Sequence, residues 1–330
     1  MIRARNLTKR FGDITAVDRL TFEIPVGQVV GFLGPNGAGK TTTMRLLTAY
    51  LPADEGEAVV MDLDVGEHPL AVRRRLGYLP ENNPLYENLE VTDALHLVGR
   101  LRGISDPGTR TERVKAVVKT CGLGSVAGRR TGELSKGFRQ RLGLAQAIIH
   151  DPDVLMLDEP TSGLDPNQVL EVRDLIRELK KEKTLLLSTH ILSEVQAVCD
   201  RVIILNAGLI VADGTPSELS GSLQNKNRLR LSLKGPSAEV REALGRIAGA
   251  SSVRVSEACA FGGGTAAEGF VVESDASADL REEVFRLASS KGWPILHLSQ
   301  ERLTLEEVFR KLTAGPEGPA RSEGREKESP

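Results

Sequence analysis

The chain has 330 residues, of which 40% are hydrophobic and 27% are charged, and its formal net charge is −2. This balance is typical of a globular protein with one large domain and a smaller one, and it gives no indication of a nucleic-acid partner. The three cysteines are too far apart for a zinc or disulfide spacing, which favours a reducing compartment, and no apolar run approaches the roughly 18 residues of a membrane span.

The N-terminal residues predict two strands before the first motif. Ile2 to Lys9 and Val17 to Ile24 carry apolar residues at strand-like spacing, and Pro25-Val26-Gly27 forms a turn after the second strand. Phe11 follows the first of these segments. Its ring either stacks on a base or packs in the core, and position alone does not decide between these interpretations.

A phosphate-binding loop follows, with the pattern G-x-x-x-x-G-K-[ST]. Gln28 to Leu33 predicts a short buried strand before the loop, and Thr42 to Tyr50 predicts a helix after it. Backbone N–H groups at such a helix start attract phosphate, Lys40 is expected to reach the β- and γ-phosphates, and Thr41 is expected to ligate Mg²⁺. The predicted cradle consists of Gly34, Pro35, Asn36, Gly37, Ala38, Gly39, Lys40, Thr41 and Thr42.

The next segment predicts a helical insert within an α/β domain, at about residues 82–150. Ala58 to Met61 predicts a strand, and the Pro- and Asn-rich residues Leu76 to Tyr86 are expected to form no regular structure. Helical spacing then recurs in three places, at residues 91–101, 113–121 and 134–149.

Two further buried strands are expected to carry polar groups at their ends. The apolar run Val154 to Leu157 leads into Asp158 and Glu159, and two adjacent carboxylates there are costly to bury without a cation. This Walker B pattern places Asp158 to hold Mg²⁺. The second strand, residues 184–188, leads to His190, which lies at a strand end, where α/β sheets place ligand groups, although a lone histidine is more often structural.

The C-terminal third predicts a separate small domain. After a polar linker, the elements follow the order βαββαβ, which is typical of a ferredoxin-like fold, and Trp293 and His297 are interpreted as packing residues. Residues 315–330 are rich in Pro, Gly and charge, which predicts disorder. The expected domains are therefore 1–220, 221–314 and a tail at 315–330.

Five segments in this order resemble the ATP-binding subunit of ABC transporters. They are GPNGAGKTT, LSKGFRQR, VLMLDEP, SGLDP and STH, and the resemblance covers roughly residues 1–220. It implies a P-loop ATPase with an antiparallel β subdomain and a helical insert, using ATP and Mg²⁺. GYLPENNPLY and LSKGFRQR resemble the branch of gliding-motility, drug and polysaccharide exporters.

The resemblance also implies a role for each matching residue. Phe11 matches the aromatic that stacks on adenine, and Glu159 matches the general base that polarises the attacking water. His190 matches the switch histidine at the γ-phosphate, and Asp165 matches the loop that couples two sites. The signature segment, residues 134–138, would complete the ATP site of a partner subunit.

Two positions depart from the commonest family pattern. The signature reads LSKGF instead of LSGGQ, although Ser135 and Gly137 retain its hydroxyl and its close-approach backbone. Glu81 stands where the family usually has Gln. A carboxylate there can still ligate Mg²⁺, but it adds negative charge near the phosphates.

The sequence therefore predicts an ATPase that drives a membrane exporter. ATP would hold together two copies, or one copy and a homologous ATPase subunit, at the cytoplasmic face of the cell membrane through a transmembrane permease. The alternative is a soluble ABC ATPase in translation or DNA repair, although this chain has one Walker A motif and no sustained heptads.

Overall fold

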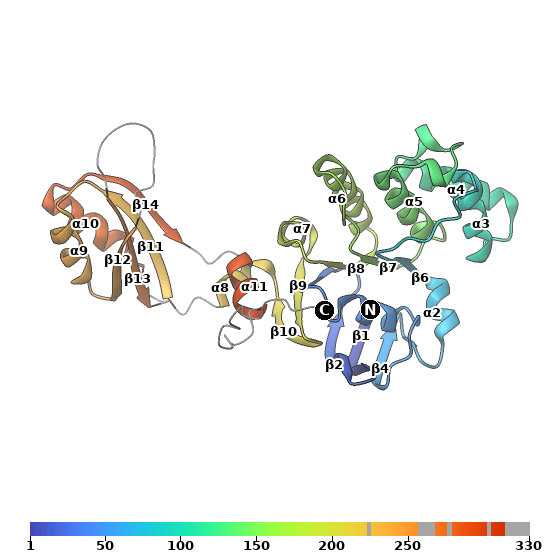
Figure 1. Cartoon of the computed structure of the whole chain (residues 1–330), viewed down its shortest axis with the longest axis horizontal. Coiled ribbons are helices and arrows are strands. Elements are labelled where there is room, and N and C mark those ends of the chain that lie inside the picture. Colours follow the sequence, from blue (N-terminus) through green and yellow to red (C-terminus); the bar gives the residue numbers. More distant parts are fainter. Residues whose placement is uncertain (223–225, 257–267, 276–278, 302–304, 314–330) are drawn as a thin grey trace, which may run out of the picture. The chain divides into compact units, whose positions relative to one another are not determined.

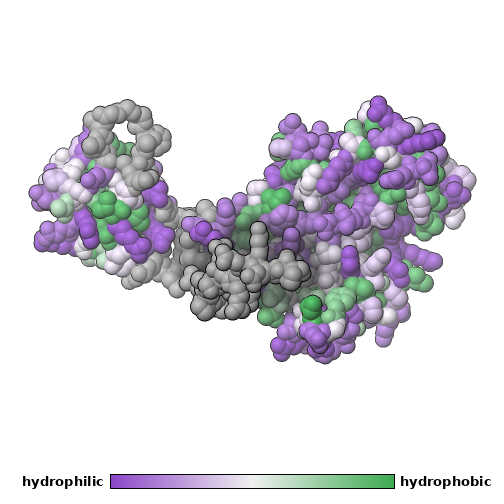
Figure 2. All heavy atoms as spheres, in the orientation of Figure 1, coloured by the Kyte–Doolittle hydropathy of each residue, from purple (hydrophilic) through white to green (hydrophobic). Residues whose placement is uncertain are grey.

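The computed structural model describes residues 1–222, 226–256, 268–275, 279–301 and 305–313 (Figure 1). The chain divides into two compact units, one made of Met1–Pro216 and the residues from Phe309 onward, the other of Ser217–Val308. No helix in the described ranges is long and apolar enough to cross a membrane. Hydrophilic residues cover much of the visible face of each unit, with hydrophobic residues scattered between them (Figure 2).

A six-stranded sheet in the first unit has the strand order β10-β9-β3-β8-β7-β6. Five neighbouring strands run parallel, and β10 pairs antiparallel at one edge. The strands β3, β7 and β8 are buried at every position, as expected for parallel strands that are covered on both faces. The bounds are β3 Val29–Leu33, β6 Leu76–Leu79, β7 Val154–Asp158, β8 Thr184–Thr189, β9 Arg201–Asn206 and β10 Leu209–Gly214.

The edge strand β6 corrects one expectation from the sequence. Leu76 to Leu79 was expected to be irregular, but these residues pair in parallel with β7. Leu76 and Leu79 are buried, and Gly77 leaves room for α5, since a Cβ on Gly77 would lie 2.4 Å from the carbonyl oxygen of Ala147. A strand of four residues is too short to show a hydrophobic periodicity. Irregular structure, as expected for this segment, begins only at Pro80.

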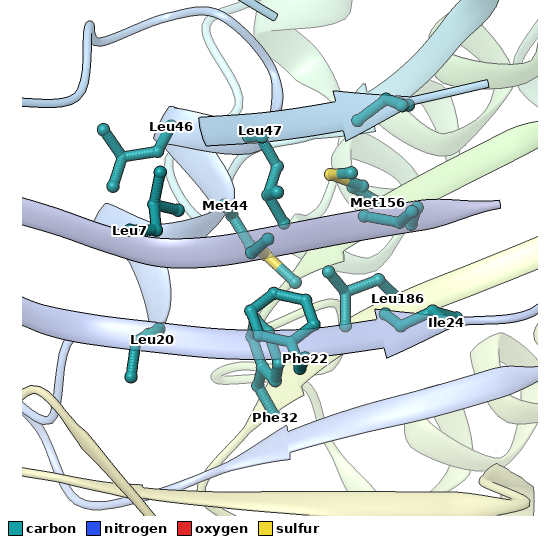
Figure 3. Packing of buried hydrophobic residues seen from close by; sticks show 14 of the residues in the cluster. Leu7, Leu20, Phe22, Ile24, Phe32, Met44, Leu46, Leu47, Met156 and Leu186 are labelled. Carbon is teal, nitrogen blue, oxygen red and sulfur yellow. The ribbon is translucent and has the colours of Figure 1, made fainter. Parts of the chain in front are cut away.

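A second, antiparallel sheet shares one core with the central sheet and the first helix (Figure 3). Its order is β2-β1-β4-β5. Phe22 of β2 and Phe32 of β3 meet edge to face with their ring centroids 5.4 Å apart, and Met44 and Leu47 of α1 join the same cluster. The bounds are β1 Ile2–Phe11, β2 Ile14–Ile24, α1 Lys40–Leu47, β4 Glu55–Val60 and β5 Leu63–Asp64. The loop between β3 and α1 is therefore held at both ends by buried elements.

The remaining helices of this unit include the expected helical insert. The helices α3, α4 and α5 contact one another, and α5 also contacts β6 (Figure 1). The helix α4 begins six residues before the expected Arg113, because Asp106 caps it by accepting from Thr109 N at 2.6 Å and Pro107 occupies its first turn. The bounds are α2 Pro69–Arg75, α3 Val91–Leu101, α4 Pro107–Thr120, α5 Lys136–Ile148, α6 Pro166–Lys180 and α7 Leu192–Val198.

The second unit has the expected βαββαβ order. Its antiparallel sheet has the order β12-β13-β11-β14, and Leu231, Phe270 and Val284 form part of its buried core, against which Trp293 packs. The bounds are β11 Lys226–Leu233, α9 Ser237–Gly245, β12 Ala250–Ser256, β13 Glu268–Asp275, α10 Arg281–Lys291 and β14 Ile295–Glu301. Two further helices, α8 at Pro216–Ser222 and α11 at Leu305–Thr313, each include residues of both units. The tail predicted at 315–330 lies outside the described residues.

Candidate functional site

The glycine loop between β3 and α1 is shaped by close backbone approaches. A Cβ on Gly34 would lie 2.5 Å from the carbonyl oxygen of Leu205, and Gly39 adopts φ +99° with its Cβ position 2.5 Å from the carbonyl oxygen of Ala16. Only glycine fits at these two positions. Gly39 is also the N-cap of α1, whose start has no side-chain cap, so its first N–H groups can bind phosphate oxygens.

Lys40 places a cation inside this loop. Its side chain is 6% exposed, and its Nζ donates to the carbonyl oxygens of Gly34 at 2.8 Å and Pro35 at 3.2 Å. The same Nζ lies 3.6 Å from Glu159 Oε1. The ammonium group therefore joins the loop to the carboxylate at the end of β7.

Asp158 is a fully buried carboxylate with an unused acceptor. Its Oδ1 accepts hydrogen bonds from Ser188 Oγ and, at 3.2 Å, from Thr41 Oγ1. Its Oδ2 is buried and has no hydrogen-bond partner in the described residues. A hard cation such as Mg²⁺ prefers oxygen ligands, so an unused carboxylate oxygen beside a threonine hydroxyl fits this ion.

Glu159 lies between Lys40 and His190. Its Oε2 is 2.9 Å from His190 Nδ1, and its backbone N–H donates to Ser188 Oγ at 3.0 Å. Glu159 adopts φ +48°, a conformation that is uncommon for a residue with a side chain. The carboxylate is 7% exposed while the His190 side chain is 49% exposed, so the pair lies at the border between core and solvent.

Lys40, Thr41, Glu159 and His190 line one open cleft of about 820 Å³, whereas the fully buried Asp158 is not among its lining residues. The cleft also contains Phe11, Glu81 and Ser162 of the SGLDP segment, together with four residues that no motif singled out: Ile14, Thr15, Ala16 and Ala207. Phe11 is 48% exposed, and Lys9 Nζ lies 5.7 Å from its ring centroid, so the core interpretation of Phe11 is wrong. Phe11 therefore lines the same cleft as the glycine loop.

The signature residues lie outside this cleft. Ser135 caps α5 by accepting from Phe138 N, and a Cβ on Gly137 would lie 2.7 Å from Gln168 Cδ on α6. Asp165 caps α6 by accepting from the N–H groups of Asn167 and Gln168, each at 3.0 Å. Ser135, Gly137 and Asp165 are not among the lining residues of the cleft.

Fold and cleft together define a P-loop nucleotide-binding protein. Residues 17–162 match the family model described as ABC transporter. The daunorubicin/doxorubicin resistance ATP-binding protein DrrA of Streptomyces peucetius is 36% identical over 319 residues, covering 96% of this chain and 93% of that protein. The ABC transporter ATP-binding protein NatA of Bacillus subtilis is 37% identical over 233 residues, covering 69% of this chain and 94% of that protein.

The chain therefore belongs to the ATP-binding proteins of ABC transporters, which are ATPases. The probable multidrug ABC transporter ATP-binding protein YbhF of Escherichia coli is 38% identical over 226 residues, and this span is 39% of its length. The soluble alternative in translation or DNA repair is not favoured, because these relatives are named as transporter proteins.

Solved structures agree with the fold. An ATP binding subunit of an ABC transporter is 27% identical, has a TM-score of 0.61 and covers 67% of this chain and 92% of that one. The dimeric bacterial cassette MJ0796 is 24% identical with a TM-score of 0.61, covering 65% of this chain and 98% of that one. The predicted ABC ATPase fold is confirmed.

Proposed function

We propose that this chain binds and hydrolyses ATP to drive a membrane exporter, as a dimer with a second copy or a homologous ATPase subunit. A transmembrane permease would hold it at the cytoplasmic face of the cell membrane and select the cargo. The support for an exporter is the relation to DrrA, a drug-resistance ATP-binding protein aligned along almost the whole chain. The βαββαβ unit is proposed to assist dimerisation.

The observation that carries the hydrolytic proposal is the position of Glu159. Its carboxylate lies 3.6 Å from Lys40 Nζ and 2.9 Å from His190 Nδ1, and it lines the same cleft as the phosphate loop. In this arrangement Glu159 accepts a proton from the attacking water, His190 and Lys40 contact the γ-phosphate, and Phe11 stacks on adenine. Catalysis of phosphoryl transfer is mainly such positioning and charge stabilisation.

The proposed magnesium ligands are Thr41, which lines the cleft, Asp158, which accepts a hydrogen bond from Thr41, and Glu81, which also lines the cleft. When bound by these residues, Mg²⁺ would neutralise the charge that develops on the phosphates. Ser135 and Gly137, at the N-terminus of α5, are proposed to complete the cleft of the partner, and Asp165 is proposed to couple the two sites. Their location outside the cleft of their own chain supports this arrangement.

Glu159→Gln tests the assignment of the base. The amide keeps the shape of the side chain but cannot take up a proton, so turnover should fall by about 10²–10⁴-fold while ATP binding persists. Turnover is measured as phosphate release by the purified chain, and binding is measured by calorimetry. Near-normal turnover in this variant would refute the role of Glu159.

A further inference from the structure

A buried glutamate on α7 contacts both loops that carry Glu159 and His190. Glu194 is 4% exposed, and its Oε1 accepts a hydrogen bond from Thr161 Oγ1. Its Oε2 accepts a hydrogen bond from Thr189 Oγ1 at 2.7 Å. Both carboxylate oxygens are thus used by hydroxyl groups, one from the loop after β7 and one from the last residue of β8.

The two threonines stand directly beside the residues proposed for hydrolysis. Thr161 lies two residues after Glu159, in a turn closed by a hydrogen bond from Ser162 N to the carbonyl oxygen of Glu159 at 3.1 Å. Thr189 immediately precedes His190, and its Oγ1 also accepts from Ile191 N at 3.0 Å. Glu159 and His190 are in contact at 2.9 Å, and the segments that carry them are therefore also joined through the Glu194 carboxylate.

Packing alone gives no reason for a carboxylate at this position. Its neighbours on the buried face of α7 are Val195 and Val198, and the described residues show no ion pair to Glu194. Burying a carboxylate without a cation is costly. A carboxylate does, however, offer two acceptor oxygens in one rigid fork, which an apolar residue of the same size cannot provide.

We propose that Glu194 is a positioning residue for ATP hydrolysis. By holding Thr161 and Thr189 together, it fixes Glu159 and His190 at the separation that the reaction needs. This inference rests on the proposed function of Glu159 as the base. Glu194 itself does not line the cleft, so it acts through the two loops and not on the nucleotide.

Glu194→Ala is the direct test, with kcat and KM for ATP measured separately. A misplacement of about 1 Å can cost on the order of 10²-fold in rate, so kcat should fall by about that factor while KM and ATP affinity change by less than about 3-fold. The matched control is Glu178→Ala, an exposed glutamate on α6 paired with Lys181, which should leave kcat unchanged. A normal kcat in Glu194→Ala would overturn the inference.

Two further variants separate positioning from a general loss of structure. Glu194→Gln keeps one acceptor oxygen for one threonine hydroxyl, and its amide N–H can donate to the hydroxyl of the other, so it should recover at least about tenfold of the rate lost in alanine. Thr161→Val removes one contact at nearly constant volume and should lower kcat by about tenfold. Adding it to Glu194→Ala should lower kcat no further, because residues that act as a unit are not additive. If the decreases in kcat caused by Glu194→Ala and Thr161→Val were additive, or if Glu194→Gln recovered none of the lost rate, Glu194 would be assigned a role in folding alone.

The same set keeps the test interpretable if Glu194→Ala does not fold. Thr161→Val and Thr189→Val then decide, since normal kcat in both would refute the inference. Wild type and Glu159→Gln are measured in parallel. Normal turnover in Glu159→Gln would refute the role of Glu159 as the base. Lost turnover in Glu159→Gln together with normal turnover in Glu194→Ala would refute only the positioning role of Glu194.

Discussion

Lys40→Ala removes the cation from the phosphate loop, and its cost can be worked out from the contacts of Lys40. A hydrogen bond to a charged group contributes about 1.5–3 kcal/mol. Lys40 Nζ already donates to the carbonyl oxygens of Gly34 and Pro35, so a phosphate oxygen replaces or shares these bonds. The net loss should therefore lie near the lower end, at about 2 kcal/mol. Since 1.4 kcal/mol is a factor of ten, ATP should bind roughly 30-fold more weakly.

The assay is calorimetric titration of ATP into the purified variant, with wild type and Lys181→Ala as references. Lys181 is an exposed lysine that forms an ion pair with Glu178 of α6, and its substitution should not change the affinity for ATP. Thermal unfolding of each variant shows that the fold is retained. If Lys40→Ala bound ATP as tightly as wild type, the glycine loop would not be the phosphate site and the reasoning would fail.

Two predictions concern stability and domain structure. Burial, and after it the charge of Arg102, lowers the pKa of His150 from 6.5 to about 4. As the pH drops from 6.5 to 4, the unfolded chain therefore binds a proton before the folded chain does, and the free energy of unfolding should fall by up to about 3 kcal/mol. Urea unfolding should show a smaller fall in His150→Gln, and an equal fall would contradict the cause. Deleting residues 221–330 should leave a folded core that binds ATP, at the cost of the hydrogen bond from Asn206 Nδ2 to the carbonyl oxygen of Leu312. Circular dichroism and calorimetry test this, and an insoluble or non-binding product would contradict the boundary.

Much of the ATPase fold could be predicted because its signals are local. The residues from Gly34 to Thr41 form a continuous motif between a buried strand and a helix, and the run into Asp158 is apolar at each position. Five such segments in a fixed order specify the family more strongly than any one of them. The same local patterns indicated the βαββαβ order of the second unit.

The parts that sequence reasoning missed depend on distant pairing. Thr15, Ala16 and Ala207 line the cleft, and Asp18 N, further along β2, donates to the carbonyl oxygen of Gly208 at 2.9 Å across a long sequence separation. No local pattern marks such a contact. Glu194 follows His190 by four residues, and nothing in the local sequence distinguishes it from an exposed residue of a helix. Its burial is evident only from the structure, in which the segments after β7 and β8 lie side by side.

Two copies of the chain are proposed to share each ATP site, and this arrangement can be tested by mixing two inactive variants. Lys40→Ala damages the phosphate loop, and Ser135→Arg damages the start of α5, which lies outside the cleft of its own chain. In an isologous mixed dimer, one composite site carries both lesions and the other carries neither. ATP hydrolysis should return when the two variants are mixed. No recovery, with mixed dimers demonstrated by crosslinking, would contradict it.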